Sequence, residues 1–464
     1  MKNLIGCLLI LGVGYGAYFV LNALPIGTGF AARYLCTAIF EQGEDARTIF
    51  NREVAPEHPL FAMATYEIDA TQRSVEARSI LGLGAMRAVH RPGFGCTLLV
   101  NTTAEALRTQ AETYRRLKPA SANPVTGLRK GADTRWVNFL NTYLDEPTQT
   151  SLRTTKAILV SHRGKLLAEG YGEGIGADTP LLGWSMTKSV LGILVGALVQ
   201  EGRANLDETG LFEPWRSSGD ARADITLRQL LEMRSGLAFS EVYAPLEDAT
   251  EMLYGSASFS QFAMNKELEF PPGSHWEYSS GTSNLVARLL HDRVGGDLVG
   301  TRAWIEAKLF APLNLSTAFI EADPSGVLVG SSYMYASAQD WLKLGAFFLS
   351  DGTVDGMRLV PEDWLTAMAQ PVSNAPQGKY GFHTWLNAGS AADPSDRLFP
   401  SLPRAFVFFR GHNDQLVAML PEEDLVVVRL GATLDDSWDT ERFLQDVLSL
   451  LESTAQSDGN PSQR

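Results

Sequence analysis

The chain has 464 residues, of which 45% are hydrophobic and 20% are charged. This balance is typical of a globular protein and excludes both a disordered chain and a membrane protein with many spans. The 39 basic and 53 acidic residues give a formal net charge of −14. Such an acidic chain binds polyanions poorly, so nucleic acid is not an expected partner. No CxxC pair and no HExxH motif occur, so the sequence gives no local sign of a metal site, and we expect no cofactor.

The first feature along the chain is an apolar segment without charge. No charged side chain lies between Lys2 and Arg33, and Asn22 is the one strongly polar residue of Leu4–Leu24. About 20 apolar residues cross a bilayer as a helix, whereas a signal peptide has a shorter apolar core. We therefore expect an uncleaved signal-anchor over residues 1–32, with a cleaved signal as the alternative. Lys2 on the short side predicts an inner-membrane protein with a single span and a periplasmic body.

Residues 33–131 are interpreted as an N-terminal extension without a catalytic motif, and its end, 118–131, is rich in Pro, Ser and Gly and typical of a linker. An exported body would lie in an oxidising compartment. Cys36 and Cys96 could then form a disulfide, and two buried free thiols are the alternative. At the other end of the chain, residues 453–464 are polar and are expected to form a disordered tail.

Residues 132–452 have the pattern of a folded enzyme domain. Residues 155–172 predict a strand, a tight turn at 162–165 and a second strand. A buried helix is expected after residue 185, closed by Gly202. The remaining expected elements are a short helix at Ile225–Met233, a helix after the turn at 271–273, a helix at Ser337–Leu349, two or three antiparallel strands within 404–431 and a helix at Thr440–Leu451. Strands at both ends with helices between them predict one α/β domain whose sheet is built from both termini.

Ser185 and Lys188 form the first candidate for chemistry. Residues three apart share a helix face, so the Ser hydroxyl and the Lys amine can meet. A Ser hydroxyl needs a base to act as a nucleophile, and a Lys amine serves when burial lowers its pKa. A helix N-terminus also stabilises a developing oxyanion. A Ser-x-x-Lys sequence also occurs by chance in a chain of this size, so a capping Ser beside a solvated Lys is the alternative.

Two further candidates lie downstream. Tyr278 follows a Pro-Pro-Gly turn, and a Tyr hydroxyl beside Lys⁺ can relay a proton to a leaving group. The same letters recur at 335–337, so the Tyr-x-Ser tripeptide alone proves nothing, and a packed Tyr is the alternative. His412 stands in Gly-His-Asn-Asp-Gln before a strand, where a backbone N–H could complete an oxyanion hole and the His side chain could line it. The alternative there is a hairpin turn with an exposed His.

The order of these motifs resembles that of the class C β-lactamase-related serine hydrolases over roughly residues 132–451. The resemblance is strongest to the 6-aminohexanoate-dimer hydrolases, which carry Tyr-x-Ser where β-lactamases carry Tyr-x-Asn. The motifs that carry it are Ser-Met-Thr-Lys at 185–188, ITLRQLLEMRSGL at 225–237, PPGSHWEYSS at 271–280, YGFHTWLN at 380–387, and GHNDQ followed by a strand and LPEEDLVVVRLG at 411–431.

The resemblance implies a β-lactamase/DD-peptidase-like α/β (α+β) fold, with an antiparallel sheet flanked by helices and an all-helical region. It implies a serine hydrolase of small amides or esters that acts through an acyl-enzyme on Ser185, with Lys188 as base and Tyr278 as proton shuttle. Ser280 would contact the substrate or the Lys, and the oxyanion would lie between the Ser185 N–H and an N–H near His412.

Two departures from the family pattern concern the substrate. The β-lactamase Lys-Thr-Gly triplet is missing from the C-terminal strand, where Phe406–Arg410 stands, and this argues against β-lactamase activity. Asp414 stands where many relatives have Gly.

Two alternatives stay open. Residues 183–187 are one residue short of Gly-x-Ser-x-Gly, so an α/β-hydrolase with Ser185 on its elbow and His412 as base is a rival enzyme. It requires a strand directly before Ser185. The other alternative is a penicillin-binding envelope protein, either non-catalytic or DD-peptidase-like, that recognises peptidoglycan or a partner.

Overall fold

The protein is seen in a computed structural model that describes residues 2–112, 127–146, 152–435 and 437–458. Its centre is a seven-stranded sheet in which every pairing is antiparallel, in the order β13-β14-β15-β16-β6-β7-β5. Its strands are β5 (Arg129–Gly131), β6 (Arg153–His162), β7 (Lys165–Tyr171), β13 (Trp385–Leu386), β14 (Val407–Gly411), β15 (Gln415–Leu420) and β16 (Leu425–Thr433). The longest ladder joins β6 to β16. The prediction of an antiparallel sheet built from both ends of the domain is therefore confirmed.

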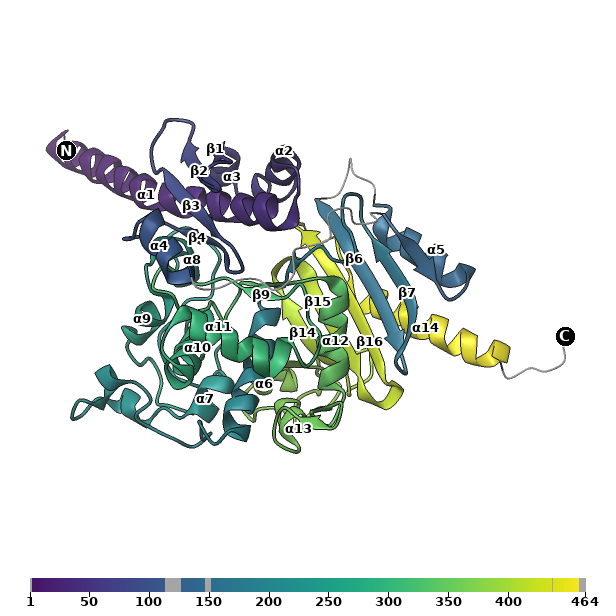
Figure 1. The fold of residues 1–464 in the computed structure, drawn as a ribbon. Helices are drawn as coiled ribbons and strands as arrows, with labels where there is room; N and C mark the ends of the chain where they lie inside the picture. Colours follow the sequence, from purple (N-terminus) through teal and green to yellow (C-terminus); the bar gives the residue numbers. More distant parts are fainter. Residues whose placement is uncertain (1, 113–126, 147–151, 436, 459–464) are drawn as a thin grey trace.

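Both faces of this sheet are covered by helices, as the alternation of its side chains requires. In β6, Ile158 and Val160 point to the face covered by α5 (Thr134–Leu144) and α14 (Thr440–Asp458). Leu159, between them, points into the apolar core on the other face of the sheet. α6 (Met186–Gln200) and α12 (Ala338–Phe348) cover that opposite face (Figure 1). α14 continues to Asp458 and so includes the first residues of the stretch expected to be a disordered tail; residues 459–464 lie outside the described part.

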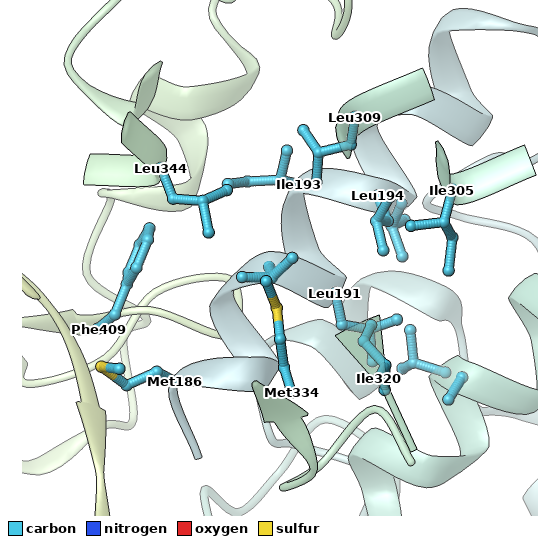
Figure 2. Packing of buried hydrophobic residues seen from close by; sticks show 14 of the residues in the cluster. Met186, Leu191, Ile193, Leu194, Ile305, Leu309, Ile320, Met334, Leu344 and Phe409 are labelled. Carbon is cyan, nitrogen blue, oxygen red and sulfur yellow. The ribbon is translucent and has the colours of Figure 1, made fainter. Parts of the chain in front are cut away.

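Helix α6 runs through the middle of the domain and is buried on all sides. Figure 2 shows its side chains Met186, Leu191 and Ile193 among apolar residues from the helical region and from the sheet. A Cβ at Gly196 would lie 2.4 Å from the indole nitrogen of Trp364, so only glycine permits this close helix contact. The apolar run after Ser185 therefore fixes the position of the helix N-terminus inside the protein.

The all-helical region lies beside the sheet (Figure 1). Its helices are α7 (Leu227–Leu231), α8 (Asp248–Gly255), α9 (Phe259–Met264), α10 (Ser280–Val294) and α11 (Leu298–Ile305), and α13 (Trp364–Met368) follows later. Two small sheets accompany them, β8 (Leu181–Leu182) with β10 (Met334–Ala336) and β9 (Phe319–Ile320), and β11 (Thr353–Val354) with β12 (Met357–Arg358). The expected helices near 225–233, 280–294 and 337–349 are thus present.

The N-terminal extension is a folded layer of its own. A four-stranded meander, β1-β2-β3-β4, is followed by the helix α4, and the bounds are β1 (Ala64–Asp69), β2 (Ser74–Ser79), β3 (Met86–Arg91), β4 (Gly95–Leu98) and α4 (Ala104–Ala111). Before it come α1 (Lys2–Thr37), η1 (Ala38–Gln42), α2 (Ala46–Ile49), η2 (Phe50–Val54) and α3 (Pro59–Ala62). The sequence did not predict this sheet. Of the expected linker, 118–126 lies outside the described residues and 129–131 forms strand β5.

Helix α1 does not end at residue 32 but continues to Thr37, and its second half packs against β2, β3 and α8. In the part of the chain that the structure describes, one helical stretch, Val20–Gln42, is long and apolar enough to cross a membrane, and 78% of an apolar 18-residue segment within it is buried inside the protein. That stretch is therefore mostly a core helix. The first half of α1 projects beyond the body (Figure 1).

The extension is closed internally by a disulfide and is fastened to the catalytic domain by ion pairs and hydrogen bonds. Cys36 of α1 and Cys96 of β4 form a disulfide, which decides between the two alternatives for these cysteines. Arg33 forms a fully buried ion pair with Glu321 at 3.1 Å, and Glu321 also accepts the N–H of Cys96 at 2.7 Å. Lys156 of β6 pairs with two carboxylates of the extension, at 2.9 Å each. The extension is thus part of the folded enzyme.

Candidate active site

Ser185 lies at the N-terminus of α6, in the turn that joins β8 to the helix. Its side chain makes no capping bond, so the hydroxyl is available for other contacts. Trp184, directly before it, has a left-handed φ of 47°, a strained conformation for a bulky residue. Ser185 is half-buried whereas Trp184 is buried, so the Ser residue keeps partial access to solvent at this turn.

Lys188 is buried, one helical turn after Ser185, and its amine has three hydrogen-bond partners. Nζ lies 3.1 Å from Ser185 Oγ, 3.0 Å from Ser280 Oγ and 2.9 Å from the Ser331 carbonyl. Burial lowers the pKa of Lys188 to about 8, and the carboxylate of Glu241 opposes that decrease. About a tenth of this amine is therefore neutral at pH 7, far more than for an exposed Lys, and this fraction can accept a proton.

Glu241 completes a chain of hydrogen bonds that begins at the Lys amine. Ser280 donates its hydroxyl to Glu241 at 2.5 Å and its backbone N–H to the same carboxylate at 2.6 Å. The Ser280 hydroxyl therefore turns its lone pairs toward Lys188 Nζ. Tyr243 donates a third hydrogen bond to Glu241, at 3.2 Å. The loop that carries Glu241 thus orients the group next to the Lys.

Tyr278 lies between the Lys and an aromatic wall. Lys188 Nζ is 4.8 Å from the centre of the Tyr278 ring, and the Tyr hydroxyl interacts with Ser185. Trp385 and Tyr380 pack against the ring at 5.1 and 5.8 Å between centroids. Burial raises the pKa of Tyr278, and the charge of Glu241 raises it further. The phenol is therefore protonated at neutral pH and can act as a proton donor.

His412 follows the end of β14, beside the turn of Ser185. A Cβ on Gly411 would collide with the Gly183 carbonyl, so only glycine lets this strand end approach the turn so closely. The His412 ring packs edge-on against Trp184, at 5.5 Å between centroids, and stacks on Tyr243 at 5.1 Å. The structure thus brings all five predicted residues, Ser185, Lys188, Tyr278, Ser280 and His412, to one place.

The N-terminal extension also reaches this site, through Glu57. His412 Nε2 lies 2.6 Å from one oxygen of Glu57, and the Asn413 amide donates to the other at 3.3 Å. Asn413 and Asp414 both have left-handed φ values, of 58° and 61°. Asp414 thus adopts the conformation that glycine, present in many relatives, favours. Glu57 thus binds the side chains of His412 and Asn413, in a turn where two residues other than glycine have left-handed backbone angles.

Sequence reasoning missed Glu241 and Glu57. Neither belongs to a motif, and each reaches the site from a segment distant in the chain. The sequence marks Glu241 only as one carboxylate in the segment before α8, and it gives no signal for Glu57. The α/β-hydrolase alternative is wrong, because the sheet is antiparallel and β8, before Ser185, is a two-residue strand outside that sheet.

The comparisons with known proteins agree with this geometry. The profile described as Beta-lactamase matches residues 143–445, more than half of the chain. The chain belongs to the Beta-lactamase family. It is therefore a serine hydrolase with an α/β fold of this type. A curated relative, the 6-aminohexanoate-dimer hydrolase of Paenarthrobacter ureafaciens, is 25% identical over 295 residues, which cover 61% of this chain and 73% of the relative.

Two solved structures show the same fold. A Bacillus anthracis protein, named as a candidate 6-aminohexanoate-dimer hydrolase, superposes with a TM-score of 0.54 at 19% identity, and the match covers 68% of this chain and 82% of that one. A penicillin-binding protein homologue of Caulobacter crescentus superposes with a TM-score of 0.52 at 14% identity, over 69% of this chain and 99% of that one. The family profile begins at residue 143, so the extension that carries Glu57 lies outside the matched region.

Proposed function

We propose that the protein is a membrane-anchored serine hydrolase that cleaves small amides or esters through an acyl-enzyme on Ser185. The observation that carries the proposal is the buried Lys188 amine, 3.1 Å from the Ser185 hydroxyl and with its pKa lowered to about 8. A neutral amine at this distance can remove the hydroxyl proton as a bond forms. The 6-aminohexanoate-dimer hydrolase relative supports an amide as substrate.

The acylation step follows from the positions of three side chains. Lys188 accepts the Ser185 proton while Oγ bonds to the substrate carbonyl carbon. The Ser185 N–H, at the N-terminus of α6, and the N–H of His412 stabilise the oxyanion. The bond to the leaving amine or alcohol then breaks, and that group takes the proton of Tyr278, whose phenol is replenished through Lys188. Water attacks the ester on Ser185 by the same steps in reverse and releases the acid.

The aromatic wall beside Ser185 suits the apolar part of a small substrate. Tyr278, Tyr380 and Trp385 pack edge to face or tilted there, and Tyr380 is fully buried. Such a wall favours a substrate whose flat or aliphatic portion lies next to the scissile bond. Glu241 places negative charge next to Lys188 and Tyr278, and this favours a neutral or amine-bearing substrate over an acid.

The localisation follows from the apolar first half of α1. Leu4–Leu24 measures about 30 Å as a helix at 1.5 Å per residue, which equals the thickness of the hydrocarbon core. A cleavage near residue 32 would cut a helix that is buried from residue 23 onward, so an uncleaved anchor preserves the fold. We infer a single span in the inner membrane, with the catalytic domain periplasmic and held next to the lipid.

The test is hydrolysis of p-nitrophenyl acetate and butyrate by the full chain in detergent. Ser185→Ala should abolish turnover, and Lys188→Met should lower it by roughly 10²–10⁴-fold without loss of folding. Ser218→Ala, in an exposed loop, is the matched control and should retain full activity. Turnover that survives both Ser185→Ala and Lys188→Met would overturn the assignment. Absence of turnover in the wild type, with these esters and with amide dimers, would favour the penicillin-binding alternative.

A further inference from the structure

The loop between β2 and β3 exposes apolar side chains at its tip. Ile80, Leu81 and Leu83 are 61%, 73% and 46% exposed, and residues 80–85 contain no charged side chain. The Ile80 N–H donates to the carbonyl of Met63, another exposed apolar residue. Isolated apolar side chains are common on protein surfaces, whereas a contiguous group at a loop tip indicates a contact with something apolar.

This loop is held against α1 at a defined height along the helix. A Cβ on Gly84 would lie 2.8 Å from Leu24 Cβ and 3.2 Å from the Pro25 nitrogen, so the loop backbone touches the helix directly. Thr28 donates its hydroxyl to the Gly84 carbonyl, from the next turn of the helix. Gly82 and Gly84 have left-handed φ values of 74° and 62°, which give the loop its tight path. The tip is therefore fixed relative to Leu24.

The same level of α1 is where the helix leaves the proposed bilayer. Residues from Ala23 onward are buried in the body, whereas Tyr18, Val20 and Leu21 are exposed. An apolar span that begins at Leu4 reaches the opposite side of the hydrocarbon core at about Leu24. The loop thus lies beside the helix at the membrane surface, and Figure 1 shows β2 and β3 next to the point where α1 leaves the body.

The charges around the loop fit this position. Arg78 and Arg87 flank it and are partly exposed, and both pair with Glu76, so the nearest charges lie on the strands and not on the tip. A tip without charge, between charged strand ends, has the polarity that an interfacial segment requires: apolar atoms enter the acyl boundary and charged atoms remain at the headgroups.

We propose that the loop 80–85 inserts its tip into the bilayer surface, as a second membrane contact beside α1. The inference rests on the proposed anchor and adds to it. A single helix leaves the body free to rotate and tilt, whereas two contacts fix its orientation. Because the Arg33–Glu321 pair and the ion pairs of Lys156 fasten the extension to the catalytic domain, the site around Ser185 is then held at a fixed angle to the membrane.

Spin labels in the full chain, reconstituted into vesicles of phosphatidylethanolamine and phosphatidylglycerol, test the proposal. Cys7→Ser removes the one cysteine outside the Cys36–Cys96 disulfide, so the background carries no free thiol. Three variants of this background then carry one label each, at Leu81→Cys, Ile10→Cys or Met357→Cys. The label at Ile10 reports the span. Met357 is an exposed apolar residue of β12, the strand that precedes α13 in the chain, and α13 lies on the side of the body away from α1 (Figure 1). Collision with oxygen and with a water-soluble nickel complex is measured at each position.

The proposal predicts that the label at 81 collides several-fold more with oxygen, and several-fold less with nickel, than the label at 357 does. Equal accessibility at 81 and 357, together with a lipid-buried label at 10, would overturn the loop contact and leave the anchor intact. Nickel accessibility at all three positions would overturn the anchor itself, and the loop contact with it.

Discussion

Replacement of Glu241 by Gln tests the electrostatics of the site most sharply. Lys188 Nζ and a Glu241 oxygen are bonded to the same Ser280 hydroxyl, at 3.0 and 2.5 Å. The two charges are therefore at most about 5.5 Å apart, and the carboxylate stabilises the protonated amine. Glu241→Gln removes that charge and keeps an oxygen that can accept the Ser280 hydroxyl, so the pKa of Lys188 should fall.

The size of the change follows from Coulomb's law. Two unit charges about 5 Å apart interact with ~3 kcal/mol at an effective dielectric constant of about 20. One pKa unit corresponds to about 1.4 kcal/mol, so the upper limit of the shift is about 2 units. Glu241 is partly exposed to solvent, and this screening reduces the shift. We expect the pKa of Lys188, about 8 in the wild type, to fall by about 1 to 2 units in Glu241→Gln.

The assay is the pH dependence of kcat/KM for p-nitrophenyl butyrate. Only the neutral amine acts as a base, so activity rises as pH rises through the pKa of Lys188. In Glu241→Gln this rise should begin at lower pH, by about 1 to 2 units. Glu247→Gln is the matched control, since Glu247 lies in the same loop but bonds to Ser240. An acid limb that stays in place, or moves to higher pH, would refute the reasoning.

Three further predictions concern the extension. Replacement of Cys36 and Cys96 by Ser opens a loop with a sequence separation of 60 and should cost about 4 kcal/mol in unfolding free energy, measured as a lower thermal midpoint; an unchanged midpoint would contradict this. Glu321→Gln leaves Arg33 buried without its counter-charge and should destabilise by about 3–5 kcal/mol in denaturant titrations, and a loss below about 1 kcal/mol would contradict the role of the pair. Glu57→Ala should lower kcat by roughly 10- to 100-fold at constant stability, because it frees the turn that holds the proposed oxyanion donor; unchanged kcat would contradict this.

The catalytic domain could be predicted because its signals are local. The strands around the turn at 162–165, where Arg163 and Gly164 both have left-handed φ, carry the hairpin pattern in their own residues. The apolar run after Ser185 shows a buried helix, and three-residue spacing places Lys188 on the face of Ser185. Tyr278 was a candidate from the chemistry of its hydroxyl, but the order of motifs was needed to prefer it to the same letters at 335–337 and to assign a role to Ser280.

The extension could not be predicted in the same way. Its strands are six residues or shorter, and β1 has only one fully buried side chain, so its alternation is weak. Its contacts with the catalytic domain, such as Arg33 with Glu321 and Glu57 with His412, join residues about 290 and 355 positions apart. Pairings over such distances depend on the tertiary fold, and no spacing in the sequence encodes them.

The most direct test of the central claim is the site of covalent modification. The full chain in detergent is incubated with a fluorophosphonate, and the labelled residue is located by peptide mass spectrometry. We predict a single phosphonyl adduct on Ser185, absent in Ser185→Ala and strongly slowed in Lys188→Met. Labelling of a different residue, or equal labelling of Ser185 after Lys188→Met, would contradict the assignment of Ser185 as a nucleophile activated by Lys188.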